Sequence, residues 1–305
     1  MAAERTDGLE TLRDFIRWGA SRFNEAGLVF GHGTDNALDE AAVLVLHALH
    51  LPFDILPEYL DSRLSREERQ GVAELLQRRI DEQIPAAYLT HSARFADLEF
   101  YVTPDVLIPR SPLAELIEQG FEPWLGGVQP ERILDLCTGS GCIAIACAYQ
   151  FPDAQVDAAD ISDAALQVAR TNVARHELED RIHLIASDVY QGLDGGPYDV
   201  IVSNPPYVAA EEMAALPAEY RHEPALGLAA GIDGLDIVRR ILRGASSHLS
   251  DDGILVVEVG SSAETLVETF PQLPFLWLDF QRGGDGVFLL TAGQLEELQP
   301  VFSDR

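Results

Sequence analysis

Val200-Ile201-Val202-Ser203-Asn204-Pro205-Pro206-Tyr207 is the stretch that decides how this chain is organised. Its first residues form a short apolar run with β-branched side chains, which is typical of a strand buried on both faces. Pro205 and Pro206 have no N–H to donate and fix φ, so the strand ends in a stiff corner. Asn204 is left at the carboxyl end of the strand, where open α/β sheets bind ligands. The corner predicts a site for a planar nitrogen-containing group, and the alternative is a turn that only ends a strand.

A strand, a Gly-rich loop and a helix precede this corner. Residues 133–137 (Ile-Leu-Asp-Leu-Cys) predict the strand, Thr138-Gly139-Ser140-Gly141 the loop, and Cys142 the start of the helix. Glycines let the backbone approach a ligand closely, and a helix N-terminus supplies unpaired N–H groups. The loop lacks the third glycine of a dinucleotide fingerprint and the Gly-Lys-Ser/Thr of a Walker loop. It therefore favours a nucleoside that carries no phosphate.

Acidic residues recur along this half of the chain. Asp135 lies in the first strand, and Asp160 ends the second strand 25 positions later (160 − 135). That spacing suits a carboxylate that accepts from ribose hydroxyls. Asp188 follows the third strand and is placed to accept from an adenine amine, with Val189 against the ring. Combined with the loop and the corner, these residues predict an S-adenosylmethionine site.

The amino-terminal third predicts a small helical bundle. Residues 9–82 carry apolar side chains at helical spacing, and Asp35 or Asn36 is a candidate N-cap for a second helix. Ser65 and Glu68 form a capping-box pattern that opens a third helix. A bundle of this kind could bind a macromolecular substrate.

The pattern changes after this bundle. Residues 86–110, beginning with Tyr88, alternate loosely between apolar and polar side chains, which predicts a β-hairpin or two short strands. Ser111 and Pro112 suit the N-cap and first position of the next helix. Arg110, just before it, is a solvated arginine by default or lines the entrance to the active site. The expected parts are a helical domain (1–84), a hairpin linker (85–110) and an α/β domain (111–305).

Composition and charge narrow the class of protein. The 305 residues are 47% apolar and 23% charged, and no apolar run reaches the length of a membrane span. Residues 1–7 lack the basic and then apolar pattern of a signal peptide, so we expect a cytoplasmic protein. The net charge is −29 and there is no lysine. Such a surface repels a phosphate backbone and steers basic proteins, or it reflects adaptation to salt or growth conditions.

The three cysteines do not predict a metal site or a disulfide framework. Cys137, Cys142 and Cys147 lie at intervals of five, which fits neither arrangement. We expect small buried side chains and no metal.

Four further stretches carry a resemblance to a known family. They are Ile84 to Leu89, Leu107 to Arg110, Glu223 to Leu226 and Gly231 to Leu235. The Asn-Pro-Pro-Tyr corner alone is shared with adenine-amino DNA and RNA methyltransferases. With these stretches, the chain resembles the protein-(glutamine-N5) methyltransferases, which methylate glutamine amides in proteins of translation. The resemblance implies a class I α/β fold with a Rossmann-like seven-stranded sheet, one strand of it antiparallel, and S-adenosyl-L-methionine as donor.

Two departures separate the branches of that family. The release-factor branch usually has Pro-Arg-Pro, an acidic residue, Thr and Glu, where this chain has Pro-Arg-Ser-Pro-Leu-Ala-Glu at 109–115. Cys137 also stands where that branch usually has Gly. Both departures resemble the branch that methylates a glutamine of large-subunit ribosomal protein L-three. The resemblance thus implies a basic ribosomal protein as partner. The lack of a membrane-length apolar run and the acidic composition predict no membrane and no direct nucleic-acid binding.

Three other functions remain alternatives: methylation of a release-factor glutamine, methylation of an adenine amino group in RNA or DNA, and a binding module without catalysis. The acidic composition argues against a nucleic-acid substrate. The intact corner argues against a pure binding module.

A glutamine substrate assigns roles to the corner. The Asn204 side-chain oxygen and the Pro205 carbonyl oxygen would accept the two amide hydrogens, while Tyr207 stacks on the amide. The expected catalytic residues are Asn204, Pro205 and Tyr207, and the substrate residues also include Pro206 and Arg110. The expected cofactor residues are Asp135, Thr138, Gly139, Ser140, Gly141, Asp160, Asp188, Val189 and Asn204.

Overall fold

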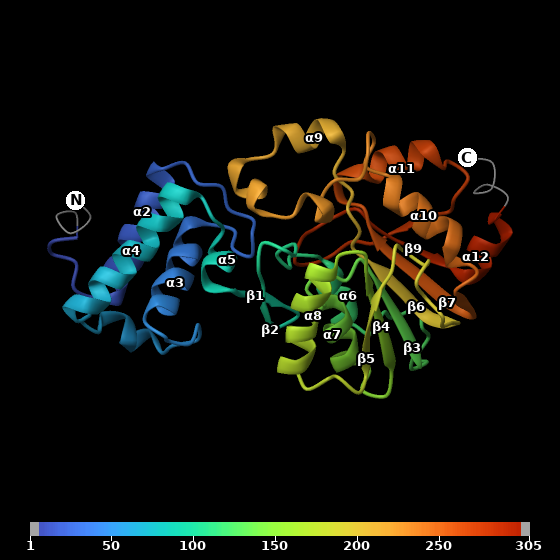
Figure 1. Ribbon diagram of the computed structural model, residues 1–305, viewed down its shortest axis with the longest axis horizontal. Coiled ribbons are helices and arrows are strands. Elements are labelled where there is room, and N and C mark those ends of the chain that lie inside the picture. The colour runs from blue at the N-terminus through green and yellow to red at the C-terminus, as the bar shows by residue number, and fades with distance from the viewer. Residues whose placement is uncertain (1–5, 300–305) are drawn as a thin grey trace. The chain divides into compact units, whose positions relative to one another are not determined.

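The computed structural model describes residues 6–299, which divide into two compact units (Figure 1). The first unit runs through Ala93 and also includes Pro217–His222; the second includes Arg94–Leu216 and continues from Glu223. This division does not separate a linker, and the boundaries expected after residues 84 and 110 stay predictions. Residues 1–5, part of the stretch inspected for a signal pattern, lie outside the described residues, as do the last six of the expected α/β domain.

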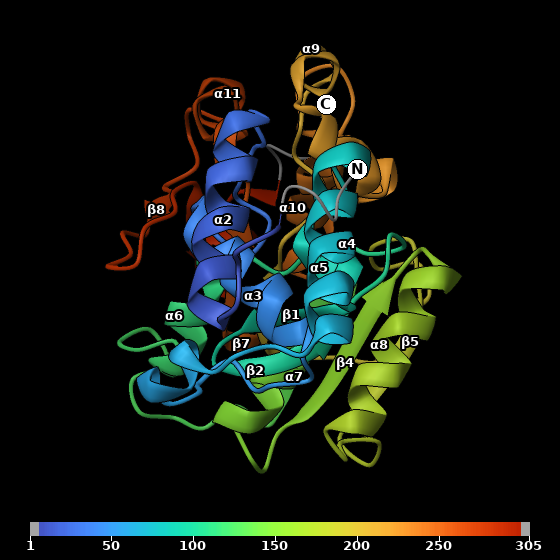
Figure 2. The same cartoon turned by 90° about the vertical axis from the view of Figure 1, so that its left-hand side faces the viewer.

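Three helices form the core of the first unit: α2 (Leu12–Glu25), α3 (Ala37–Ala48) and α4 (Arg66–Glu82). Figure 2 shows them as a bundle. The Asn36 side chain caps α3, and Ser65 with Glu68 forms the capping box of α4, so both predicted helix starts are confirmed. Apolar residues on the inner faces, including Phe15, Leu44 and Leu76, are fully buried. The short helices η1 (Pro57–Asp61) and α5 (Ala86–Thr90) complete this part of the chain.

A buried ion cluster also stabilises the first unit. Arg79 of α4 is 0% exposed and donates through Nε to Glu40 of α3 at 2.5 Å. Glu219 lies in the segment η2 (Ala218–His222), and its carboxylate approaches Arg79 Nη1 at 3.7 Å. The backbone N–H of Val29 donates to the same carboxylate at 2.9 Å. These charged contacts attach η2, which follows the Asn-Pro-Pro-Tyr corner in sequence, to the helices of its own unit.

A two-stranded hairpin follows α5. Its strands are β1 (Ser92–Phe95) and β2 (Leu98–Tyr101), so a hairpin in this region is confirmed. The prediction of strand character at Tyr88 is wrong, because Tyr88 lies in α5. Pro85 precedes the first turn of that helix and Ala86 and Ala87 are strong helix formers, which outweighs the loose alternation.

Seven strands form one sheet in the second unit, in the order β5-β4-β3-β6-β7-β9-β8. Their bounds are β3 (Arg132–Leu136), β4 (Gln155–Asp160), β5 (Ile182–Ala186), β6 (Tyr198–Ser203), β7 (Leu249–Glu258), β8 (Leu276–Trp277) and β9 (Val287–Thr291). The pairs from β3 to β7 are parallel, and β9 is antiparallel to both of its neighbours. The expected seven-stranded fold with one antiparallel strand is confirmed. The chain order reverses between β3 and β6, which is where sheets of this kind bind ligands.

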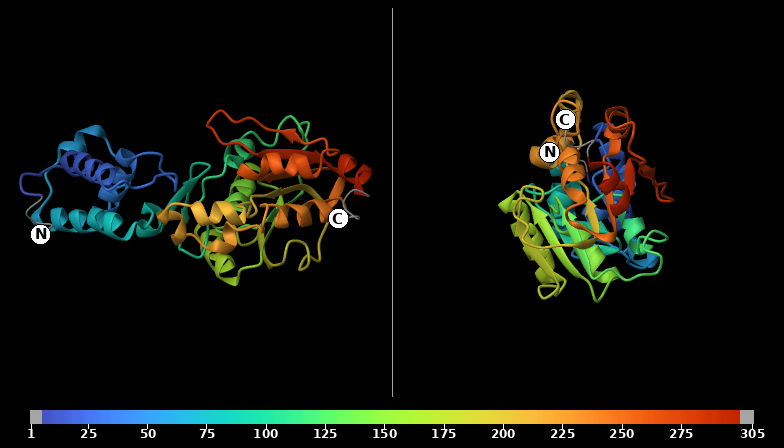
Figure 3. Two further views of the ribbon diagram at one scale, coloured as in Figure 1. Left: turned by 90° about the horizontal axis from the view of Figure 1, so that it is seen from above. Right: turned by 90° about the vertical axis from the view of Figure 1, so that its right-hand side faces the viewer.

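Helices cover both faces of this sheet (Figure 3). One face carries α6 (Leu113–Glu118), α7 (Cys142–Gln150) and α8 (Asp163–Arg175); the other carries α10 (Asp236–Ala245), α11 (Ala263–Thr269) and α12 (Ala292–Glu297). Along β6, Val200 and Val202 enter the first core and Ile201 the second. Burial on both faces explains why this strand has no polar alternation. The remaining short helices are α9 (Ala210–Ala215), η3 (Ala225–Gly227) and η4 (Gly260–Ser262).

Helix α6 begins at Leu113, one residue later than predicted, with Pro112 at the N-cap position. Ser111 Oγ nevertheless accepts a hydrogen bond from the Leu113 N–H at 3.1 Å. None of the helices between residues 6 and 299 is long and apolar enough to cross a membrane.

Candidate active site

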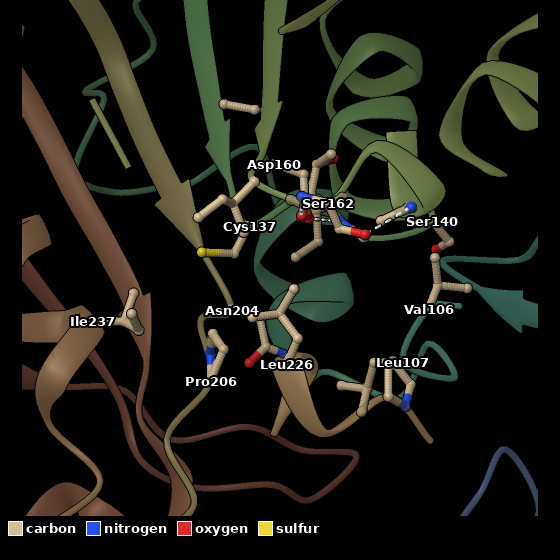
Figure 4. A pocket seen from close by; sticks show the side chains of 18 of the residues that line it. Val106, Leu107, Cys137, Ser140, Asp160, Ser162, Asn204, Pro206, Leu226 and Ile237 are labelled. Carbon is tan, nitrogen blue, oxygen red and sulfur yellow. Dashed lines mark hydrogen bonds between the residues drawn. The ribbon is translucent and has the colours of Figure 1, made fainter. Parts of the chain in front are cut away.

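A cavity of about 290 Å³ lies at the carboxyl ends of β3, β4 and β6, within the second unit (Figure 4). Figure 4 shows Asn204 and Pro206 across the cavity from Asp160 and Ser140. Most of the predicted site residues line it: Arg110, Thr138, Gly139, Ser140, Asp160, Asp188, Val189, Asn204 and Pro206. Four predicted residues are not part of the lining: Asp135, Gly141, Pro205 and Tyr207. The structure therefore brings together the loop, two of the acidic strand ends and the corner, which lie far apart in sequence.

The Gly-rich loop has the backbone that a close approach requires. Gly139 and Gly141 have φ of +54° and +81°, and Cys137 has φ of +60°, which is uncommon for a residue with a side chain. A Cβ on Gly141 would lie 3.3 Å from the Cβ of Ala169 on α8, so glycine lets α7 and α8 approach one another there. Figure 4 shows the Cys137 side chain reaching into the cavity.

Asp135 supports this loop from beneath. Its side chain is fully buried, and its Oδ2 accepts from the Thr138 hydroxyl and, at 3.1 Å, from the Ala144 N–H. Its Oδ1 has no hydrogen-bond partner among the described residues. Burial raises the pKa of Asp135 to about 7, against the two hydrogen bonds, which lower it. The side chain holds the turn and the start of α7 and contributes no surface to the cavity.

Asp160 lines the cavity at the end of β4. Its Oδ2 accepts from the Gly139 N–H and its Oδ1 from the Ser162 N–H, both at 2.9 Å. Burial raises the pKa of Asp160, while these backbone hydrogen bonds lower it. A carboxylate oxygen accepts more than one hydrogen bond, so Asp160 retains capacity for a ligand hydroxyl beside the loop.

Asp188 and Val189 occupy a second edge of the cavity. One Asp188 carboxylate oxygen is 2.8 Å from Nη2 of Arg240, which also lines the cavity, and Val189 is 7% exposed with φ of +57°. The prediction that Asp188 accepts from an adenine amine therefore involves a carboxylate that also has an arginine partner.

The corner presents one unsatisfied acceptor. Asn204 Oδ1 is buried and has no hydrogen-bond partner among residues 6–299. A buried amide oxygen without a donor is costly, so such an atom in a native site points to a donor supplied by a ligand. Pro205, the next residue, is buried and offers a carbonyl oxygen but no N–H.

Tyr207 is held by residues outside the corner. Its hydroxyl donates to Glu258 Oε1 at 3.2 Å, and its carbonyl oxygen accepts from Ser262 Oγ at 2.7 Å. Glu258 ends β7 and is only 5% exposed. The Ser111 hydroxyl donates to the second oxygen of this carboxylate.

Arg110 lines the cavity with its guanidinium already engaged. Its two terminal nitrogens donate to both oxygens of the buried Glu223, at 2.5 and 2.8 Å. The same Glu223 carboxylate accepts from the Ile108 N–H at 3.2 Å. This bidentate pair fixes the segment that leads into α6, so Arg110 organises the cavity wall.

Sequence reasoning missed the residues that support this site. Asn172 of α8 is fully buried and donates to the carbonyl oxygens of Ser140 and Tyr101, at 2.8 and 2.9 Å. Asn172 has no signal in the sequence, because it lies within a helix among other polar residues. A carboxylate at the end of a buried strand was the available signal for Glu258.

Metal ligands are not gathered in the described part of the chain. No group of three or more His, Cys, Asp or Glu side chains there is arranged to hold a metal ion. All three cysteines are free, and burial raises the pKa of each thiol.

Comparisons with known proteins identify relatives over nearly the whole chain. Residues 122–219 match the family model described as the methyltransferase small domain. The chain is 55% identical over 295 residues to the ribosomal protein uL3 glutamine methyltransferase of Xanthomonas campestris pv. campestris, covering 97% of this chain and 96% of that protein. It is 53% identical over 289 residues to the protein of the same name from Neisseria meningitidis serogroup B, covering 94% and 95%.

A solved structure shares the fold. The hMettl16 catalytic domain in complex with the MAT2A 3′UTR hairpin 6 is 20% identical, with a TM-score of 0.50 over 74% of this chain and 81% of that chain. At that identity the likeness shows the fold alone. The family resemblance inferred from the sequence is confirmed by the two curated relatives. With more than half of the residues identical over nearly the whole of both proteins, this chain belongs to the family of ribosomal protein uL3 glutamine methyltransferases.

Proposed function

We propose that this protein transfers the methyl group of S-adenosyl-L-methionine to the side-chain amide nitrogen (N5) of a glutamine in ribosomal protein uL3, releasing S-adenosyl-L-homocysteine. The observation that carries the chemistry is the buried, unpartnered Asn204 Oδ1 beside a cavity whose opposite wall is the Gly-rich loop. The names of the relatives supply the substrate.

The residues around the cavity fit a nucleoside methyl donor. Gly139 and Ser140 offer backbone against a ligand, Asp160 offers acceptors for ribose hydroxyls, and Val189 offers an apolar contact for a base. When bound, the donor supplies an electrophilic methyl group on a sulfonium. These roles, with Asp188 and Thr138 beside them, remain part of the proposal.

The corner supplies what a carboxamide needs in order to react. An amide nitrogen is a poor nucleophile because its lone pair is delocalised into the carbonyl group. Asn204 Oδ1 and the Pro205 carbonyl oxygen accept the two N–H groups, which turns the nitrogen toward the methyl and stabilises positive charge that develops on it. The new N–C bond forms as the S–C bond breaks, and the nitrogen then loses one proton. Tyr207 stacks on the amide plane and excludes water.

The substrate branch rests on two lines of support. Residues 109–115 and Cys137 depart from the release-factor pattern, and the curated relatives carry the uL3 name. A basic ribosomal protein also complements a net charge of −29. We expect the reaction in the cytoplasm, where the substrate is made, without direct nucleic-acid binding.

Methyl transfer to defined substrates tests this proposal. The enzyme is incubated with methyl-labelled S-adenosylmethionine and either unmethylated uL3, a release factor, or ribosomal RNA. We expect label on a glutamine of uL3, located by mass spectrometry of its peptides. Label confined to the release factor or to RNA would contradict the proposed substrate, and labelling of none of the three would contradict the proposed activity.

A further inference from the structure

Tyr207 is enclosed by two segments that follow it in sequence, one at Gly234 and one at residues 258–262. Ser262 Oγ donates to its carbonyl oxygen, and Glu258 accepts from its hydroxyl. A Cβ on Gly260 would lie 2.6 Å from Tyr207 Cε2 and 2.8 Å from Cζ, closer than real Cβ contacts. A Cβ on Gly234 would lie 2.4 Å from the Tyr207 carbonyl oxygen. A side chain at Gly260 would displace the Tyr207 ring, and one at Gly234 would displace its backbone, so the two glycines leave Tyr207 a single close-packed position.

Glu258 is the polar centre of this enclosure. It is 5% exposed, and its two oxygens each have one hydroxyl donor, Ser111 on one and Tyr207 on the other. Burying a carboxylate is costly, and burial raises the pKa of Glu258, while the Ser111 and Tyr207 hydroxyls and the charge of Arg110 lower it. The Arg110 guanidinium itself is paired with Glu223. Packing alone does not require a carboxylate at this position, so the burial of Glu258 indicates a role beyond packing.

The position of Glu258 explains what the two hydroxyls achieve. Glu258 ends β7, the strand beside β6, and its neighbour Val257 pairs with Ser203, directly before Asn204. The carboxylate is therefore anchored in the same rigid sheet as the amide-binding corner. Its contact with Tyr207 fixes the ring relative to Asn204, and its contact with Ser111 fixes the wall segment that carries Arg110.

We infer that Glu258 is a positioning residue for methyl transfer. By accepting the hydrogen bond of the Tyr207 hydroxyl, it holds the ring so that the ring face stacks on the plane of the substrate amide. This inference rests on the proposed function. Glu258 acts through Tyr207 and does not touch the reacting atoms. Loss of the Tyr207 contact leaves the lining of the cofactor cavity unchanged, since neither Glu258 nor Tyr207 is part of it, whereas Ser111, the other partner of Glu258, is.

A double-mutant cycle tests the inference. Glu258→Gln, Tyr207→Phe and the double variant are assayed with unmethylated uL3, with Glu268→Gln, an exposed carboxylate on α11, as the matched control. We expect Glu258→Gln to lower kcat roughly tenfold, as for one lost buried hydrogen bond to a charged group. The dissociation constant of S-adenosylmethionine should change less than kcat, because only the Ser111 contact of Glu258 reaches the cavity lining, and Glu268→Gln should behave as wild type.

The double variant separates positioning from general stability. The cycle is run in a Ser111→Ala background, so that the second hydroxyl partner of Glu258 is absent throughout. If Glu258 acts through Tyr207, adding Glu258→Gln to Tyr207→Phe then lowers kcat no further, because the remaining hydroxyl partner is already absent. Effects that multiply, or a wild-type kcat in Glu258→Gln, would overturn the inference. Inactivity of the wild-type enzyme on uL3 would instead contradict the proposed function.

A readout that needs no substrate accompanies the kinetics. NMR of protein with labelled tyrosine rings, with the Tyr207 signal assigned through Tyr207→Phe, reports the motion of this ring. We expect a restrained ring in the wild-type protein and in Glu268→Gln, and faster ring motion in Glu258→Gln. Equal ring motion in the wild type and Glu258→Gln would overturn the inference whatever the activity.

Discussion

Ser203 Oγ donates a hydrogen bond of 2.7 Å to the carbonyl oxygen of Leu136. The two residues are also partners in the parallel pairing of β6 with β3. Ser203 directly precedes Asn204, and Leu136 directly precedes the turn that begins at Cys137. The Asn-Pro-Pro-Tyr corner and the Gly-rich loop are thus joined across adjacent strand ends by a buried hydrogen bond. A donor held by the loop and an amide held by the corner would meet at a fixed separation, which is what an in-line transfer requires.

Asp160→Ala should weaken cofactor binding. The change removes the acceptor proposed for the ribose and also the acceptors of the Gly139 and Ser162 N–H groups, which loosens the loop. We expect the dissociation constant of S-adenosylmethionine, measured by calorimetry, to rise about 10- to 100-fold, the range for losing a hydrogen bond to a charged group. Asp163→Ala, an exposed change in the first turn of α8, is the control. Equal affinity in both variants would show that the ribose site lies elsewhere.

Gly260→Ala should lower turnover with little effect on cofactor affinity. The added Cβ meets the Tyr207 ring, and φ of +42° adds backbone strain of roughly 1–2 kcal/mol. Because the ring must shift, we expect kcat on uL3 to fall while calorimetry still reports wild-type cofactor binding. Gly293→Ala on α12, where no atom lies within 4 Å of the added Cβ, should leave kcat unchanged. Wild-type turnover in Gly260→Ala would mean that the placement of this ring is unimportant.

Glu40→Ala should destabilise the helical unit. It leaves the fully buried Arg79 without its 2.5 Å partner, and breaking a buried pair in this way costs about 3–5 kcal/mol. Glu82→Ala provides the matched control, because it breaks an exposed ion pair with Arg78 on α4, the helix that also carries Arg79. That control should change the free energy of unfolding by less than about 1 kcal/mol. Urea unfolding of both variants measures the two changes in the free energy of unfolding. Similar midpoints would contradict a stabilising role of the buried ion cluster.

Asp135→Asn should flatten the pH dependence of stability. Burial raises the pKa of Asp135 from 3.8 to about 7 in the folded protein. The folded state therefore holds this proton more tightly than the unfolded state, and the stability it contributes is complete below about pH 4 and is lost as pH rises toward 7. Linkage limits the loss to roughly 4 kcal/mol.

The comparison of unfolding curves isolates this group. Asp160 also has a raised pKa, so the informative quantity is the difference between the wild type and Asp135→Asn at each pH. We expect the wild type to lose stability relative to the variant between pH 4 and 7. Parallel pH profiles would show that Asp135 is charged in the folded protein.

The sequence was sufficient for the sheet and for most of the cavity. Few structures are compatible with uninterrupted apolar strands of which one is followed by glycines and another by prolines. These patterns predicted Gly139, Asp160 and Asn204 at one edge of the sheet, and all three line the cavity. Helix caps such as Ser65 could also be predicted from the sequence, because the capping hydrogen bonds lie within one helical turn. Local patterns predict local structure, and parallel topology then fixes which strand ends meet.

The supporting residues depend on contacts that no local pattern encodes. Glu258 meets Ser111 across 147 positions, and Glu223 meets Arg110 across 113. Arg110 was assigned to the substrate, yet its guanidinium is paired with Glu223 on the cavity wall. Tyr88 was expected in a strand because of a loose alternation, and this prediction failed because the helix propensity of its neighbours outweighs that pattern. Such pairings become visible only once the fold has brought the segments together.

The most direct test of the central claim is single-turnover methylation of uL3 by Asn204→Ala. Asn204 Oδ1 is the buried acceptor that has no protein partner, and we assign it one of the two amide N–H groups. Removing one contact that stabilises developing charge should slow transfer about a hundredfold, or ~3 kcal/mol, while S-adenosylmethionine still binds with wild-type affinity by calorimetry. Transfer by Asn204→Ala at a rate close to that of the wild type would contradict the account.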